Sequence, residues 1–202
     1  MIRKAPLALA FALVVAVASL AQAQTWNIDS GHSAAQFAVR HNMVSTVRGD
    51  MGAVKGTVTY DGKNLAAAIV EATVDVTAIN TRNEKRDTHL KSADFFDVAS
   101  HPTITFKSTK VVPGANGAFQ IVGNLTMRGV TKEVTLNAEA LTSPIKDGRG
   151  NQRTGTTATG KINRQDFGVN WNRALDVGGV VVSDEVTITL DVQLILPASP
   201  AK

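Results

Sequence analysis

The sequence predicts an all-β protein, an eight-stranded antiparallel up-and-down barrel with a short helical insertion around residues 82–96. Apolar and polar side chains alternate in about eight segments, a pattern typical of antiparallel strands with one apolar face. Short breaks rich in Gly, Asp and Asn separate several of these segments, as in hairpins. Closing eight strands into a barrel removes the exposed edges of an open sheet, so we favour a barrel over the alternative, a two-sheet sandwich.

Residues 1–23 have the pattern of a secretory signal peptide. Two cations, Arg3 and Lys4, precede a short apolar run, and a small-x-small site ends at Ala23. The run is shorter than the roughly 20 residues of a membrane span, which disfavours a retained anchor. We therefore expect cleavage after Ala23 and a single domain over residues 24–202, a length that suits one buried core.

Composition limits the partners of this domain. Without Arg3 and Lys4, 19 basic and 17 acidic side chains remain, and the basic ones are scattered rather than interleaved with aromatic residues. This distribution does not support nucleic-acid binding. The chain has no cysteine for a disulfide, and no later segment is long and apolar enough to span a membrane as a helix.

The first predicted strand lies in "GHSAAQFAVRH", residues 31–41. Ala35, Phe37 and Val39 would share one face of this strand. His32 and His41 are an odd number of residues apart and would point to opposite faces, which argues against a shared metal ion.

The same alternation predicts seven further strands. They include residues 56–60, 68–76, 104–106, 119–127, 134–138, 158–162 and 186–196. The last of these segments has the longest strict alternation and is the clearest strand.

The segment "TRNEKRDTHLKSADFFD" interrupts this pattern. Thr81 and Glu84 have the spacing of a capping box, Asp87 and Lys91 are four residues apart, and Pro102 follows the segment. These features predict a helix, or two short helical turns, from Arg82 to about Phe96.

An eight-stranded barrel is either filled by side chains or holds one small ligand. Small residues at inward positions favour a cavity here; they are Ala68, Ala72, Gly123, Ala138, Ala158 and Gly160. A filled barrel stays as an alternative. An apolar cavity selects an apolar guest, because burial gains about 25 cal/mol per Å². The predicted lipid-contacting residues are Phe37, Val39, Val58, Val70, Val74, Phe106, Phe119, Ile121, Leu125, Leu136, Ile162, Ile188 and Leu190.

An amphiphilic guest also needs polar contacts at the cavity mouth. The candidates for contacting its head group or shaping a lid are His41, Arg82, Arg86, Asp87, His89, Arg164 and Asp166. The alternative is structural: charges on the helix would only face solvent, and Arg164 and Asp166 would form an ion pair or turn that closes the barrel end.

No catalytic residue, metal site or cofactor is predicted. The chain contains no nucleophile elbow, HExxH motif or glycine-rich phosphate loop. The competing hypothesis is a lipid-modifying enzyme in which His41, His89 or Asp87 acts as acid or base at the pocket mouth.

Several segments, in order, resemble the YceI-like family of polyisoprenoid-binding periplasmic proteins. They are "WNIDSGHSAAQFAVRH", "AINTRNEKRDTHLKSADFFDVASHPTITFKS", "GNLTMRGVTKEVTL", "INRQDFGV" and "VSDEVTITLDV". The resemblance covers residues 26–196, and "RDTHLKSADFFD" before "HPTITFKS" is its most specific part. It implies a lipocalin-like barrel, a bound isoprenoid or similar long-chain amphiphile, and the periplasm of a Gram-negative bacterium. Transport or storage of quinone-type lipids and stress protection all stay open, and a homodimer is compatible with the sequence.

Overall fold

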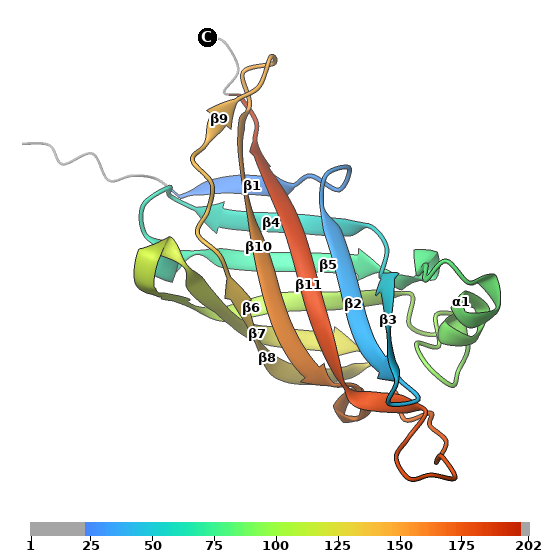
Figure 1. The fold of residues 1–202 in the computed structure, drawn as a ribbon. Coiled ribbons are helices and arrows are strands. Elements are labelled where there is room, and N and C mark those ends of the chain that lie inside the picture. The colour runs from blue at the N-terminus through green and yellow to red at the C-terminus, as the bar shows by residue number, and fades with distance from the viewer. Residues whose placement is uncertain (1–22, 199–202) are drawn as a thin grey trace, which may run out of the picture.

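The strands of the computed structural model, which describes residues 23–198, form one sheet that closes on itself (Figure 1). The strands are β1 (Gln24–Ile28), β2 (Ala34–His41), β3 (Ser45–Asp50), β4 (Val54–Tyr60), β5 (Ile69–Asp75), β6 (Thr103–Pro113), β7 (Phe119–Met127), β8 (Val130–Ala138), β9 (Ile145–Lys146), β10 (Gln152–Asn163) and β11 (Val182–Leu196). The predicted signal peptide lies outside the described residues, apart from Ala23 at its end.

The closed ring consists of β1, β4, β5, β6, β7, β8, β10 and β11, each antiparallel to its neighbours. Its last two strands pair along the whole of β10, from Gln152 opposite Leu196 to Asn163 opposite Glu185. This ring confirms the predicted all-β, eight-stranded antiparallel barrel.

The long strand β11 pairs with two successive strands on its other edge. Ile195 and Leu194 face β1, whereas residues 182–191 face β2. The β2–β3 hairpin is therefore an extension of the wall at one end, inserted in the chain between the ring strands β1 and β4. β2, one of the eight predicted strands, thus lies outside the closed ring. The alternation did not predict β1, β3 and β9, which are only five, six and two residues long.

The predicted helical insertion contains one short helix, α1 (Glu84–Lys91), followed by turns. The helix begins after Asn83, whose side-chain oxygen accepts a hydrogen bond from the backbone N–H of Arg86 at 3.0 Å. The predicted capping box is thus wrong: Thr81 lies before the cap and its hydroxyl bonds Asp87 instead. Figure 1 shows α1 beyond one end of the barrel.

Strands β6 and β7 of the barrel wall approach each other closely at Gly123 in β7. A Cβ atom there would lie 2.5 Å from the carbonyl oxygen of Lys107 and 2.5 Å from Cζ of Phe106. The register of β6 against β7 shifts between Ser108 and Lys110, beside this position. Gly123 therefore lets β6 bulge against β7, and the ring of Phe106 occupies the space that a side chain would take.

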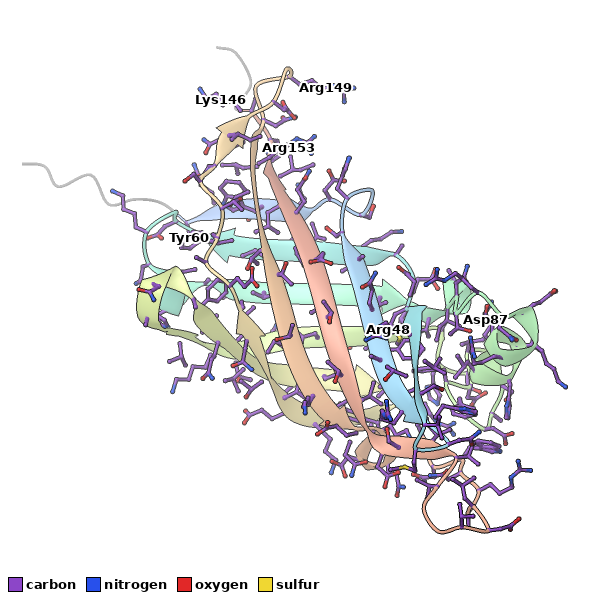
Figure 2. All side chains as sticks on the ribbon, in the orientation of Figure 1. Arg48, Tyr60, Asp87, Lys146, Arg149 and Arg153 are labelled. Atoms are coloured by element: carbon purple, nitrogen blue, oxygen red, sulfur yellow. The ribbon has the colours of Figure 1, made fainter. Side chains whose placement is uncertain are left out.

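An ion-pair network joins the turn after β1 to the β9–β10 hairpin. Arg153 donates from Nη1 to Asp29 and from Nε to Asp147, both at 2.8 Å. Asp29 also accepts from Gln193 of β11 at 3.1 Å and bonds the His32 ring at 2.8 Å. Figure 2 shows Arg153 at the base of this hairpin.

These contacts change the acidity of both carboxyls. Hydrogen bonds from Arg153 and then Asn151 hold the pKa of Asp147 well below its ordinary value of 3.8. Burial alone would raise the pKa of Asp29, but hydrogen bonds from Arg153 and His32 outweigh it, so this pKa is also lowered.

We expect Gly123→Ala to reduce the free energy of unfolding by about 1–3 kcal/mol, because the new methyl group overlaps backbone that cannot easily move. The melting temperature should fall by about 3–10 °C in a thermal scan followed by circular dichroism. Gly148→Ala is the matched control, since nothing lies within 4 Å of its Cβ position. Equal melting temperatures for both variants would contradict the close approach at β7.

We expect the stabilising contribution of Asp147 to depend on pH. Because its pKa is lower in the folded than in the unfolded chain, this contribution is complete well above pH 3.8 and is lost as the pH falls through the folded value. Asp147→Asn should therefore be less stable than wild type at pH 7, and the difference should shrink below about pH 4 in urea titrations. Asp176→Asn, an exposed loop change, is the control. A difference that is constant with pH would contradict this role of Asp147.

Candidate ligand-binding cavity

The interior of the barrel is a cavity of about 790 Å³. This volume lies within the range of small-molecule sites, roughly 300–1,000 Å³. Alternation along each strand turns one side chain in two inward, so every strand of the closed ring contributes to the lining. Most of these inward side chains are aliphatic or aromatic. The barrel is therefore hollow, and its interior offers an apolar site.

All of the predicted lipid-contacting residues lie on the cavity surface. They are Phe37, Val39, Val58, Val70, Val74, Phe106, Phe119, Ile121, Leu125, Leu136, Ile162, Ile188 and Leu190. Their positions follow from the period of two, because the sequence pattern identifies the inward face directly. Contact between these residues and a lipid stays a prediction.

The small residues behave differently from one another. Ala68, Ala72 and Ala158 line the cavity, as expected. Gly123 and Gly160 do not enlarge it, because the side chains of Phe106 and Leu136 occupy the space next to them. The expectation that every small inward residue leaves room is thus wrong for the two glycines, whose role is to allow close packing in the wall. Ala138, buried in β8, does not line the cavity either.

Polar lining groups gather at the end of the cavity next to α1. They include His41, at the end of β2, and Asn83, Lys85, Arg86, Thr88, His89 and Ser92, from the helical segment. Gln36, Tyr60, Thr156 and Arg164 are further polar residues of the lining. Of the predicted polar candidates, His41, Arg86, His89 and Arg164 line the cavity, whereas Arg82, Asp87 and Asp166 do not. Lys85 is not among the predicted candidates, although Lys85, His89 and Ser92 have the i, i+4, i+7 spacing of one helix face.

Arg86 is held in place by the buried residue Thr81. Its Nε donates to the Thr81 hydroxyl at 2.7 Å and its Nη2 donates to the Thr81 carbonyl at 2.9 Å. The Thr81 hydroxyl and N–H in turn donate to Asp87 at 2.5 and 2.8 Å. Asp87, which Figure 2 labels on α1, thus supports Thr81 and Arg86 from outside the cavity.

His89 belongs to an aromatic group that closes the same end. Its ring lies edge-on to Phe95 and Trp171, with ring centres 5.0 and 5.1 Å apart. Its Nε2 is 2.8 Å from a carboxylate oxygen of Asp94. Of the three alternative acids or bases of the enzyme hypothesis, His41 and His89 line the cavity, whereas Asp87 lies outside it.

Arg164 lies at the start of a 3₁₀ turn, Arg164–Phe167, and is 4 % exposed. Its five N–H donors meet five acceptors: the carbonyls of Val169, Trp171, Val182 and Ser183, and a carboxylate oxygen of Asp184. Burial lowers the pKa of Arg164, and the charge of Asp184 opposes this shift.

The hydrogen bonds of Arg164 correct two expectations. No N–H of its guanidinium is left to bind a ligand head group. The predicted ion pair with Asp166 does not form either, because Asp166 is exposed and the partner of Arg164 is Asp184, at 3.2 Å. Arg164 instead ties the segment after the 3₁₀ turn to the start of β11.

Between Ala23 and Ala198, no cluster of three or more His, Asp or Glu side chains could hold a metal ion. No helix in this part of the chain is long and apolar enough to cross a membrane.

Comparison with known proteins gives one family. Residues 26–194 match the YceI-like domain. A UPF0312 protein of Staphylococcus aureus (strain N315) is 37% identical over 161 residues, which cover 80% of this chain and 91% of that protein. A UPF0312 protein of Vibrio cholerae serotype O1 is 35% identical over 169 residues, covering 83% and 89%.

Solved structures share the fold. BcnA of Burkholderia cenocepacia has a TM-score of 0.68 at 22% identity, covering 82% of this chain and 98% of that one. The YCEI protein of Campylobacter jejuni has a TM-score of 0.67 at 26% identity, covering 79% and 90%. A polyisoprenoid binding domain from Saccharophagus degradans has a TM-score of 0.62 at 14% identity, covering 85% and 98%.

We expect Arg164→Met to reduce the free energy of unfolding by about 3 kcal/mol, because it leaves several buried carbonyls without a donor. Urea unfolding at pH 7 measures this loss. Arg173→Met, in the exposed part of the neighbouring loop, should change stability by less than about 0.5 kcal/mol. A similarly small effect of Arg164→Met would contradict the role of Arg164 in closing the barrel.

Proposed function

Because this chain belongs to the YceI-like family, we propose that it is a periplasmic binding protein that carries a polyisoprenoid or a similar long-chain amphiphile in its barrel. The observation that carries this proposal is the cavity of about 790 Å³ and its apolar lining. The Saccharophagus degradans domain of the same fold, described as polyisoprenoid-binding, agrees with it.

The lining explains why an apolar chain would enter. Each buried CH₂ group of a ligand contributes about 0.8 kcal/mol, against the cost of ordering the ligand. Inside the barrel, Phe106, Ile121 and Leu125 offer the tail an apolar surface. The polar groups at the α1 end, among them His41, Arg86 and His89, are positioned to receive the head. We therefore orient the ligand with its tail in the barrel and its head next to α1.

The proposal assigns binding rather than catalysis. The family and the polyisoprenoid-binding neighbour favour a binding protein, and the cavity lining is dominated by side chains without acid–base chemistry. The signal-peptide pattern of residues 1–23 supports export to the periplasm. In that compartment the protein would take part in transport or storage of isoprenoid quinones, or in a stress response.

The direct test is native mass spectrometry of the protein purified gently from periplasm, followed by extraction and identification of any bound molecule. We expect a long-chain isoprenoid at one molecule per protein, and a chain that begins at Gln24. A protein that is empty and also takes up no polyprenyl quinone or polyprenol would overturn the proposal. Chemical conversion of the added lipid would support the enzyme hypothesis instead.

We expect Leu125→Trp to weaken lipid uptake at least tenfold, because Leu125 lines the cavity and the larger ring would occupy the space of the tail. Titration of delipidated protein with a polyprenyl quinone measures this effect, and circular dichroism checks the fold. The matched control is Asn124→Trp, on the exposed face of the same strand. Unchanged uptake by the Leu125 variant would show that the lipid does not occupy this part of the barrel.

A further inference from the structure

We propose that the head of the bound amphiphile carries a negative charge, on a carboxylate or a phosphate, and that Lys85 and Arg86 hold it at the α1 end of the cavity. This inference rests on the proposed function and adds the chemical class of the ligand head. It comes from the distribution of charge on the cavity surface.

The charged side chains on the cavity surface have one sign. Lys85, Arg86 and Arg164 line it, whereas no Asp or Glu of residues 23–198 does. Tyr60, near the other end of the cavity, adds no negative charge at pH 7. The ordinary pKa of its hydroxyl is 10.0, and burial and then the charge of Asp61 raise this pKa further. A negatively charged head thus meets no carboxylate on this surface.

Neither of the two cations forms a direct ion pair with an acid near α1 in the described chain. Asp87 accepts its hydrogen bonds from Thr81, and Asp94 bonds His89. Within the described part of the chain, neither Lys85 nor Arg86 has a carboxylate oxygen within 4.0 Å. Their charges are therefore available to a ligand.

The two cations differ in how they are held. Thr81 accepts hydrogen bonds from the Nε and Nη2 atoms of Arg86. The Nη1 atom of Arg86 donates to no acceptor in the described chain. Lys85, one residue earlier, is an exposed and flexible side chain. An oxyanion in the cavity mouth would complete the hydrogen bonds of Arg86, and Lys85 would add a second charge. Charge-assisted bonds next to an apolar wall are strengthened by the low local dielectric.

Arg164, which lines the same cavity, differs from Arg86 in its hydrogen bonds and its ion pair. Each of its five N–H donors has a protein acceptor, and Asp184 pairs with its charge. Within the described chain, Arg86 has protein acceptors for only two of its five N–H donors and no carboxylate oxygen within 4.0 Å. We therefore assign Arg164 to the support of the fold and Arg86 to contact with the ligand head.

The test is a titration of delipidated protein with two pairs of ligands at pH 7 and fixed ionic strength. One pair is a polyprenyl phosphate and the polyprenol of equal chain length, and the other is a long-chain fatty acid and the matching fatty alcohol. We expect the charged member of each pair to bind at least about tenfold more tightly. Lys85→Gln and Arg86→Gln should each reduce that ratio severalfold, because each removes one positive charge from the α1 end of the cavity.

Lys91→Gln is the matched control, because Lys91 ends the same helix but does not line the cavity. The ratio should stay at its wild-type value in this variant. Among residues 23–198, the Lys85 side chain makes no hydrogen bond that Lys85→Gln would remove, so the test stands even if Arg86→Gln fails to fold.

Three outcomes would overturn the inference. Equal binding of acid and alcohol by the wild type would leave the proposed carrier function in place but exclude a charged head. If Lys91→Gln lowers the ratio of acid to alcohol affinity as much as Lys85→Gln does, the preference for the acid comes from the general positive charge and not from a contact with Lys85. Failure of all four ligands to bind would overturn the proposed function together with this inference.

Discussion

The structure depends on the pairing of β10 with β11. This pairing closes the sheet, and an open sheet would leave two long edges of unpaired backbone groups. The 15-residue strand β11 is long enough to pair with β10 on one edge and with both β1 and β2 on the other. It therefore sets the register of the ring and attaches the β2–β3 hairpin that extends the wall toward α1. The sheet encloses a cavity because the pairing of β10 with β11 closes it into a ring.

Closure also decides where polar groups can lie. Alternation turns one face of each ring strand inward, so the middle of the barrel is apolar and the polar contacts lie in segments that end or interrupt strands. At one end, the network around Arg153 and Asp29 ties the first turn to β10 and β11. At the other, Arg164 holds the segment before β11, and Thr81 holds Arg86. Hydrogen-bond networks thus hold segments at both ends of the barrel. Among the described residues, the cations that line the cavity are Lys85, Arg86 and Arg164.

The predictions from sequence succeeded where a side chain's role follows from its position in a strand. Val58, Ile121 and Leu190 could be placed on the cavity surface from the period of two alone. The polar candidates could not be sorted in this way, because each role depends on partners that are distant in sequence or set by a turn. Arg164 and Arg86 were both candidates for contacting a head group. Asp184 and four carbonyls accept all the hydrogen bonds that Arg164 can donate. Thr81 accepts hydrogen bonds from only two nitrogens of Arg86, and in the described chain the third has no acceptor.

By itself, the sequence determined the fold class, the inward face of the strands and an apolar interior, because alternation is a local property that each strand carries in its own residues. It also indicated the family. Only the tertiary structure decided that β1 rather than β2 completes the ring, that Gly123 and Gly160 serve packing rather than space, and which cations face the cavity. These features arise where segments far apart in the chain meet. The alternation within one segment does not determine how strongly it pairs with a distant one.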